Sequence, residues 1–279
     1  ELPINRQKVL YIYCKEETTM RNFTKLLLFL SIAAVALTFT GFTYTPYAFR
    51  PLDVPNALST FAYGIDGNNV VGTYTDTSGK YHGFFYNGST YATLDVPGAA
   101  HTTACGISGS AIVGFYMDTS GKTHGFFYNG STYTTLDAPG ARHTTACGIS
   151  GNTIVGYYED TSINQREHGF LYNIANRTFT TLDPPGTVRT NAYGISGNLV
   201  VGFYTISSGL TYGFIYNGST YTYLAFPGGV STTHAYGTDA NNIVGEYLAA
   251  DGRHGFLYNS TDRTFKTFDK PNAAITVPY

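Results

Sequence analysis

Tryptophan is absent from this chain of 279 residues, and charged residues make up only 12% of it. The 16 Lys and Arg are balanced by 18 Asp and Glu, and no basic stripe is present, which argues against nucleic acid as a partner. The chain also lacks a Gly-x-Ser-x-Gly motif, a phosphate-binding loop and the spacing of zinc ligands. We therefore expect no cofactor and no metal site.

The chain is instead rich in repetition. One glycine, followed by Ile in four of five copies, recurs at spacings of 42, 42, 46 and 43 residues: Gly64, Gly106, Gly148, Gly194 and Gly237. A His-Gly-Phe or Tyr-Gly-Phe triplet marks the same copies and begins at His82, His124, His168, Tyr212 and His254. A Leu-Asp-x-Pro mark brackets them, so the repeats fill about 52–272. Internal repetition of this kind fixes an architecture before other signals do.

Each copy predicts four short strands. In the second copy these are Thr102–Ser108, Ala111–Met117, Thr123–Tyr128 and Ser131–Leu136. Asn129-Gly130 is a strong hairpin signal, because both residues tolerate positive φ in a type I′ turn. Tight turns between successive strands indicate an antiparallel meander.

The faces of these strands predict how the meanders pack. Phe126 and Tyr128 point to one face and Phe127 to the other, so both faces are apolar and need cover. Four strands per unit of roughly 40–45 residues are typical of propeller blades. We predict an all-β fold, a five-bladed β-propeller with twenty strands, with the Ala104-x-Gly106 strand innermost; a β-solenoid is the rival.

The N-terminus differs from the repeats. Residues 1–19 precede a plausible start at Met20, and we interpret them as a non-native upstream segment. A short basic region precedes the apolar stretch Leu26–Phe42, the pattern of a secretory signal peptide, with an uncleaved anchor as the alternative. We thus divide the chain into 1–19, a signal peptide or anchor over 20–48, and one propeller domain over 49–279, closed by its own C-terminal strand.

Cys105 and Cys147 occupy one repeat position, 42 residues apart, where the other copies have tyrosine. Export would permit a disulfide between them. Equivalent positions on neighbouring blades, however, lie near or beyond the Cα separation of about 7 Å that a disulfide bridges. We favour two small buried side chains over a disulfide.

The pattern GI-x-G-x-x-[IV]-VG-x-Y-x-D-x-x-G-x-x-HGF-x-Y resembles the HAF-type extracellular repeat, with Gly83, Gly125, Gly169 and Gly255 in place of the alanine that gives this repeat its name. The resemblance covers about 52–272, and the fourth copy departs from it at Tyr212. It implies an exported, bacterial surface or secreted protein. It brings no established activity and no catalytic residue.

The repeated histidines and aspartates are predicted to have structural rather than catalytic roles. One histidine per blade, in phase with Phe and Tyr, predicts a hydrogen bond to a neighbouring strand rather than a metal ligand. The repeated aspartates that precede x-Pro predict turn chemistry, because glycosidases need unlike carboxylates at one point: Asp53, Asp95, Asp137, Asp183 and Asp269. Asp76, Asp118 and Asp160 are expected to stabilise turns and not to bind calcium.

Two positions of the innermost strand vary while the residues around them agree. The first row is Ser59, His101, His143, Arg189 and Thr232, and the second row is Phe61, Thr103, Thr145, Asn191 and His234. Their spacing predicts that both rows share one side of the strand, with the first row at the rim of one propeller face beside the Pro-Gly loops. Polar residues there suit a neutral ligand such as a glycan; the alternative is a solvated rim without a ligand.

We interpret the chain as a secreted or cell-surface binding or scaffold module, not an enzyme, with lectin-like multivalent glycan binding. The candidate contacts are His101, His143, Arg189, Asn191 and His234. Glycans or cell-surface proteins are the expected partners, and a membrane only through an uncleaved N-terminal segment. The alternatives are a purely structural or protein-binding propeller and a glycan-processing enzyme, for which Glu246, an acid among the aligned Phe and Tyr, is the one supporting residue.

Overall fold

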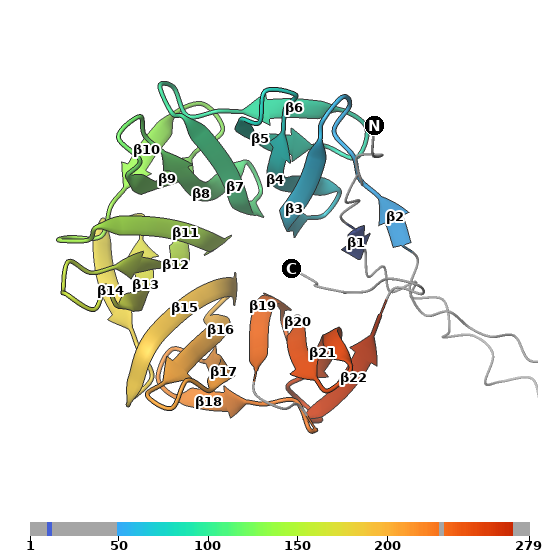
Figure 1. The fold of residues 1–279 in the computed structure, drawn as a ribbon, viewed down its shortest axis with the longest axis vertical. Coiled ribbons are helices and arrows are strands. Elements are labelled where there is room, and N and C mark those ends of the chain that lie inside the picture. The colour runs from blue at the N-terminus through green and yellow to red at the C-terminus, as the bar shows by residue number, and fades with distance from the viewer. Residues whose placement is uncertain (1–9, 13–48, 229–231, 270–279) are drawn as a thin grey trace, which may run out of the picture.

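The computed structural model describes residues 10–12, 49–228 and 232–269. Five antiparallel sheets of four strands each are arranged radially around a central axis (Figure 1). The protein is therefore a five-bladed β-propeller with twenty blade strands, as the repeat predicts. The radial arrangement excludes the rival β-solenoid.

Within each blade the strands follow chain order from the axis outward, joined by tight turns. Their bounds are β3 (Ser59–Asp66), β4 (Asn69–Thr75), β5 (Tyr81–Tyr86) and β6 (Tyr91–Leu94) in blade one; β7 (His101–Ser108), β8 (Ala111–Met117), β9 (Thr123–Tyr128) and β10 (Tyr133–Leu136) in blade two; β11 (His143–Ser150), β12 (Thr153–Glu159), β13 (Glu167–Asn173) and β14 (Thr178–Leu182) in blade three; β15 (Thr187–Ser196), β16 (Leu199–Ile206), β17 (Thr211–Tyr216) and β18 (Tyr221–Leu224) in blade four; and β19 (Thr233–Asp239), β20 (Asn242–Ala249), β21 (Gly252–Asn259) and β22 (Thr264–Phe268) in blade five. In blade two, β8 and β9 have the predicted bounds, while β7 begins one residue earlier and β10 two residues later than predicted.

Register confirms the predicted faces. His124 pairs with Tyr116, and Phe126 pairs with Gly114, so these side chains share one face of blade two, while Phe127 lies opposite Val113 on the other face. A glycine opposite each phenylalanine leaves room for the ring. The five equivalent rings are fully buried: Phe84, Phe126, Phe170, Phe214 and Phe256.

Close packing at the axis explains the Ala-x-Gly pattern of the innermost strands. A Cβ on Gly106 would lie 2.7 Å from the carbonyl oxygen of Cys147 on the next blade. The same close approach occurs at Gly64, Gly148 and Gly194. The ladder slips by one residue between each Ala and Gly of this pattern, for example between Ala104 and Gly106. The residue between them, Tyr or Cys, is thus the extra residue of a β-bulge.

The hydrophobic core consists of clusters at the seams between blades. Val71 of blade one packs with Phe126 of blade two, and equivalent clusters join blades two and three, three and four, and four and five. A fifth cluster, around Phe84, is formed in the described part of the chain by residues of blade one and its lead-in alone. Four seams therefore join consecutive blades through apolar side chains.

The fifth blade completes itself. β22 pairs with β21 through partners such as Gly255 and Phe268, which confirms that the C-terminal segment supplies the outermost strand. β2 (Phe49–Pro51) instead pairs with β1 (Leu10–Ile12), a segment that the sequence places outside the fold. The β1–β2 pair lies at the side of the ring between blades one and five (Figure 1).

No helix long and apolar enough to cross a membrane is found in residues 10–12, 49–228 and 232–269. The apolar stretch Leu26–Phe42, expected to be a signal peptide or anchor, lies outside the described residues.

Candidate functional site

The two variable rows lie on one side of the innermost strands, as predicted. His101 pairs with Met117 and Thr103 with Phe115, and both pairs belong to the same face of blade two. In blade four, Arg189 pairs with Thr205 and Asn191 with Phe203. Each row therefore supplies one side chain per blade at the same end of the ring.

Three side chains of the first row bind the preceding blade. The Tyr81 backbone N–H donates to Nδ1 of His101 at 3.1 Å, and the Thr123 N–H donates to Nδ1 of His143 at 3.0 Å. At the next seam the Arg189 side chain takes over this contact, with Nε 3.0 Å from Oε2 of Glu167. Each of these contacts links the start of an innermost strand to the start of the third strand of the blade before it.

Asn191 joins the same acid. Its Nδ2 donates to Oε2 of Glu167 at 2.8 Å, so Glu167 binds Arg189 and Asn191 together. Asn191 is 2% exposed, and its Oδ1 is buried without a partner among the described residues. A buried acceptor without a donor costs free energy, which a bound water or ligand recovers.

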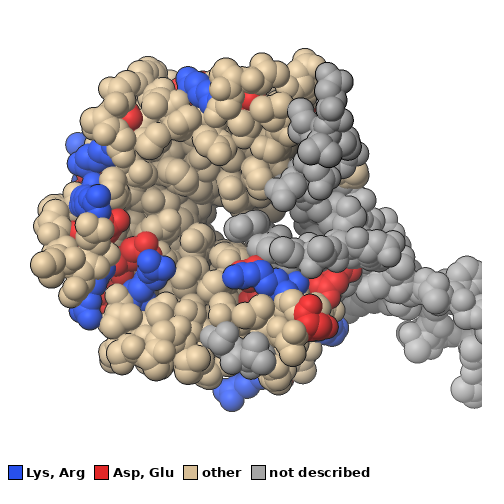
Figure 2. Space-filling view, in the orientation of Figure 1, with Lys and Arg blue, Asp and Glu red and all other residues tan. Residues whose placement is uncertain are grey.

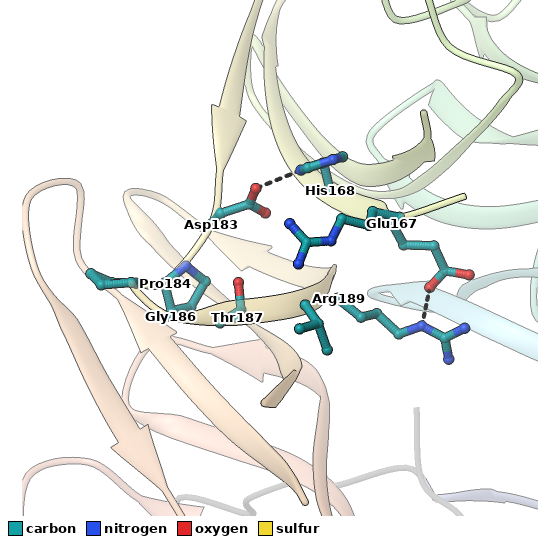
Figure 3. Close-up of a pocket in the computed structure, with 10 residues that line it drawn as sticks. Glu167, His168, Asp183, Pro184, Gly186, Thr187 and Arg189 are labelled. Atoms are coloured by element: carbon teal, nitrogen blue, oxygen red, sulfur yellow. Dashed lines mark hydrogen bonds and ion pairs between the residues drawn. The ribbon is translucent and has the colours of Figure 1, made fainter. Parts of the chain in front are cut away.

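A hollow of 280 Å³ opens at this seam between blades three and four (Figure 3). Its wall includes the Glu167–Arg189 ion pair, the His168–Asp183 hydrogen bond and residues 184–188, the end of the loop after β14 and the start of β15. Arg166 also lines it, and its guanidinium makes no hydrogen bond or ion pair within the residues that the structure describes. The hollow therefore presents unused donors beside engaged carboxylates.

Charged residues are unevenly spread over the face of the propeller that Figure 2 shows. Figure 2 shows Lys, Arg, Asp and Glu gathered over the third blade and its junction with the fourth, and over the fifth blade beside the central opening. A second hollow, of 440 Å³ on blade one, is lined by residues such as Val54, Tyr74 and Thr93 and contains no Asp, Glu, His, Lys or Arg. The seam hollow is thus the more polar of the two.

The repeated histidines form what we call histidine clamps. In blade one, Nδ1 of His82 lies 2.7 Å from Asp95 in the loop after β6, and Nε2 lies 3.1 Å from Asp76 in the turn after β4. The clamps of blades two, three and five are built alike around His124, His168 and His254. The structural role is confirmed, but the predicted partner, a neighbouring strand, is wrong: the partners are aspartates in two loops.

Both ring nitrogens of a clamp face carboxylate oxygens, which accept hydrogen bonds only, so both are satisfied when the ring is a cationic imidazolium. Burial would lower the pKa of His82, but hydrogen bonds from its ring to Asp95 and Asp76 outweigh it and raise the pKa above its usual value. The hydrogen bond to Asp269 likewise raises the pKa of His254. On the other side, hydrogen bonds from Ser78 and then His82 hold the pKa of Asp76 well below its usual range.

Asp76 also shapes its own turn. Its Oδ1 accepts hydrogen bonds from Ser78 and from the Lys80 N–H at 3.0 Å, and Asp118 and Asp160 do the same in blades two and three. The predicted role in turns is confirmed. The x-Pro aspartates of the clamps bind histidine, which the turn interpretation did not include, while Asp53 is exposed.

Blade four lacks the whole clamp. Tyr212 replaces the histidine, Ala225 the loop aspartate and Ile206 the turn aspartate. The Tyr212 ring packs against Tyr223 instead, with ring centroids 4.8 Å apart. All three members are lost together in this blade, as is expected if they form one unit.

His234, the fifth candidate contact, belongs to a separate cluster on blade five. Its Nδ1 lies 3.0 Å from Oε1 of Glu246, and the Tyr236 hydroxyl donates to the same oxygen at 3.1 Å. Arg253 forms an ion pair with that oxygen too. Burial by itself would raise the pKa of Glu246, but the hydrogen bond from His234 and the charge of Arg253 leave it below its usual value. Glu246 is therefore a buried, ionised carboxylate.

The structure thus divides the five candidate contacts between several places. Arg189 and Asn191 share one seam, His101 and His143 lie at two others, and His234 lies with Glu246. Sequence reasoning missed Arg166, Glu167, Tyr236 and Arg253. Glu167 and Arg253 occupy one repeat position, filled by Tyr81, Thr123 and Thr211 in the other blades. Their departure from the repeat was the available signal.

Cys105 and Cys147 are free thiols, which confirms that they are unpaired; Cys147 is buried as expected, whereas Cys105 is partly exposed. Burial raises the pKa of Cys105 to about 12 and that of Cys147 well above its usual value. Because the thiolate is the nucleophilic form, neither cysteine is a reactive nucleophile at neutral pH. In the described part of the chain, no group of three or more His, Cys, Asp and Glu is placed to hold a metal ion.

No protein-family model and no curated protein matches the chain in sequence. Solved structures do share its fold. The putative TolB of Agrobacterium tumefaciens superposes with a TM-score of 0.60 at 13% identity, over 79% of this chain and 83% of that one. The SapL1 lectin, solved with α-methyl fucoside, superposes with a TM-score of 0.51 at 13% identity, over 77% of this chain and 81% of that one.

An enzyme is also among the similar structures. A chain from a study of two prolyl endopeptidases superposes with a TM-score of 0.52 at 10% identity, and the match covers 78% of this chain but only 36% of that one. At 10–13% identity these likenesses show the propeller fold and nothing finer.

Proposed function

We propose that the protein is a binding module for polar, polyhydroxylated ligands such as glycans, held by the seams at the rim formed by the two rows. The observation that carries the proposal is the hollow between blades three and four, where Arg166 and Arg189 present unused donors beside Glu167. A sugar offers several hydroxyl groups that both donate and accept, which suits such a mixed lining. The fold itself hosts a fucose-binding lectin elsewhere.

Repetition supports a module with several weak sites. His101 and His143 occupy at their seams the position of Arg189, and each keeps its second ring nitrogen, Nε2, free of partners in the described residues. The exposed Tyr81 ring packs edge-on against His101, at a centroid distance of 5.2 Å. Sites of this kind on one face raise avidity through simultaneous engagement.

We further propose that the protein acts outside the cell, as the signal-like stretch Leu26–Phe42 and the HAF-type resemblance suggest, and that it has no turnover of its own. An analysis of secreted product by intact mass tests the first point. We expect a mature form that lacks residues 1 to about 48. A hydrolase screen on purified protein tests the second, and turnover that Glu246→Gln abolishes would overturn it.

A glycan array with the full chain tests the binding function. We expect hits that weaken at least several-fold in Arg189→Ala. Lys266→Ala is the matched control, because it also removes one exposed positive charge but lies on the outermost strand β22. An array without hits, or equal binding by Arg189→Ala and the wild type, contradicts the proposal.

A further inference from the structure

A charged cluster on blade five breaks the repeat at three positions at once. Glu246 stands where the other blades have Thr73, Phe115, Tyr157 and Phe203. His234 stands where they have Phe61, Thr103, Thr145 and Asn191, and Arg253 where they have Tyr81, Thr123, Glu167 and Thr211. The fold therefore forms four times without this combination, so folding alone does not require it.

Burying this carboxylate is costly. The side chain of Glu246 is 4% exposed, and a buried ion pair commonly adds no stability over apolar residues of similar size. Blade four shows the apolar solution at the same position, where Phe203 packs in the seam against His234 with a centroid distance of 4.1 Å. Features that break a local rule at such a cost are frequently functional sites.

The hydrogen bonds of the cluster leave specific atoms unused. His234, Tyr236 and Arg253 all bind Oε1 of Glu246, and Oε2 accepts nothing from the residues that the structure describes. Nδ1 of His234 faces Glu246, and its Nε2 has no partner among the described residues. This nitrogen accepts a hydrogen bond when the ring is neutral and donates one when the ring is a cation. The Arg253 side chain is 43% exposed, and only one of its nitrogens, Nη1, is engaged. The cluster thus keeps Oε2 of Glu246 and Nε2 of His234 unengaged near the free guanidinium donors of Arg253, with aromatic rings beside them.

We propose that this blade-five cluster is a saccharide site of its own, distinct from the sites at the earlier seams, in which His234 and Arg253 bind two neighbouring hydroxyl groups and Glu246 holds both side chains in place. One hydroxyl, which can donate or accept, bonds Nε2 of His234, and its neighbour accepts from the Arg253 guanidinium. Phe203 and Tyr236, whose rings lie edge to face at 6.5 Å, line the apolar side of the sugar. This inference rests on the proposed glycan-binding function and assigns it one specific site.

The repeat supplies the test. A triple variant, Glu246→Phe with His234→Thr and Arg253→Thr, gives blade five the residues of blade two at all three positions. Titration calorimetry with methyl glycosides selected on the array compares it with the wild type. We expect an unchanged or higher melting temperature and one fewer site per chain. A melting temperature lowered by more than about 10 °C with an unchanged number of sites assigns the cluster to stability and overturns the inference.

A milder variant covers the case in which the triple variant does not fold. Glu246→Gln keeps the size of the side chain and removes its charge, so we expect at least tenfold weaker binding at one site and no change at the others. The ¹⁵N resonance of His234 Nε2 should move on titration of the wild type, and O-methylation of either neighbouring hydroxyl of the glycoside should abolish the movement. If the wild type binds glycosides while this resonance stays still, only the blade-five site is wrong. If it binds none, the glycan-binding function itself is wrong.

Discussion

Nδ1 of His82 lies 2.7 Å from Oδ2 of Asp95, and this contact ties the third strand of blade one to the loop that leads into blade two. The opposite nitrogen reaches Asp76, so one ring connects a strand, a turn and an inter-blade loop. The Val96 N–H in that loop also donates to Thr102 of blade two, at 3.2 Å. The clamp therefore fixes the direction in which the chain leaves blade one.

The clamps predict a pH window of stability. The pKa of His82, His168 and His254 is raised on folding, so their contribution is complete below the unfolded value of about 6.5 and is lost as the pH rises through the folded value. The pKa of Asp76 is lowered, so its contribution is complete above about 3.9 and is lost as the pH falls. We expect the melting temperature to be highest between about pH 4 and 6.5 and to fall towards pH 9.

Replacement of one clamp histidine tests this assignment. His82→Gln should cost about 1 kcal/mol of unfolding free energy at pH 6 and less at pH 9, where the ring of the wild type is neutral. Tyr212→Gln is the control, because blade four has no clamp, and its effect should not depend on pH in this range. A His82→Gln profile parallel to that of the wild type from pH 5 to 9 would falsify the imidazolium assignment.

A clamp built into blade four should be cooperative. The turn that would hold the new aspartate already has the right backbone. The Ile206 N–H donates to the Leu210 carbonyl at 3.1 Å, as the Asp76 N–H donates to the Lys80 carbonyl in blade one. We expect Tyr212→His alone to be destabilising, because it loses the contact with Tyr223 and gains no carboxylate. The triple variant combines Ile206→Asp, Tyr212→His and Ala225→Asp. Its free energy of unfolding, measured with urea, should be higher by about 0.5–3 kcal/mol than the sum of the three single effects predicts. Strict additivity would show that the three positions are not one unit.

The fold could be read from the sequence because five copies constrain each other. Each turn signal and each alternating pair recurs, so the bounds of β8 and β9 and the faces of Phe126 and Phe127 follow without tertiary information. The clamp could not be read in the same way, since periodicity shows that His82 and Asp95 recur but not that the loop folds back on the ring. In blade four the equivalents of His82, Asp95 and Asp76 are all replaced. This joint replacement was a usable sign that the three side chains are in contact.

The candidate site was less accessible to this reasoning. Glu246 stood out because it departs from Phe and Tyr at one position, but its partners lie on two other strands, β19 and β21. Arg253 and Tyr236 become neighbours of Glu246 only through the pairing of β19, β20 and β21. Arg189 was found as part of a variable row, whereas its partner Glu167 comes from the preceding blade, and a row within one strand does not show which residue of another blade it meets.

Thiol reactivity gives a direct measure of packing at the axis. Burial raises the pKa of Cys105 to about 12, and Cys147 is only 7% exposed, so neither thiolate forms at pH 8 in the folded protein. In a Cys14→Ser variant, we expect no maleimide adduct within minutes under native conditions and two adducts in 6 M guanidinium chloride, counted by intact mass. Rapid labelling of the native protein would contradict the packing described for β7 and β11, and a mass lower by two hydrogens before labelling would reveal a disulfide.

The seam between blades two and three depends on the absence of a side chain at Gly106. A Cβ there would lie 2.7 Å from the Cys147 carbonyl oxygen and 3.1 Å from Cγ2 of Val113, and neither the backbone nor this fully buried valine has room to move. We expect Gly106→Ala to lower the free energy of unfolding by about 1–3 kcal/mol, the usual cost of overpacking, because blades two and three must separate. Ser110→Ala, on an exposed turn of the same blade, should change it by less than about 0.5 kcal/mol. Equal urea midpoints for the two variants would mean that the innermost strands do not approach each other this closely in solution.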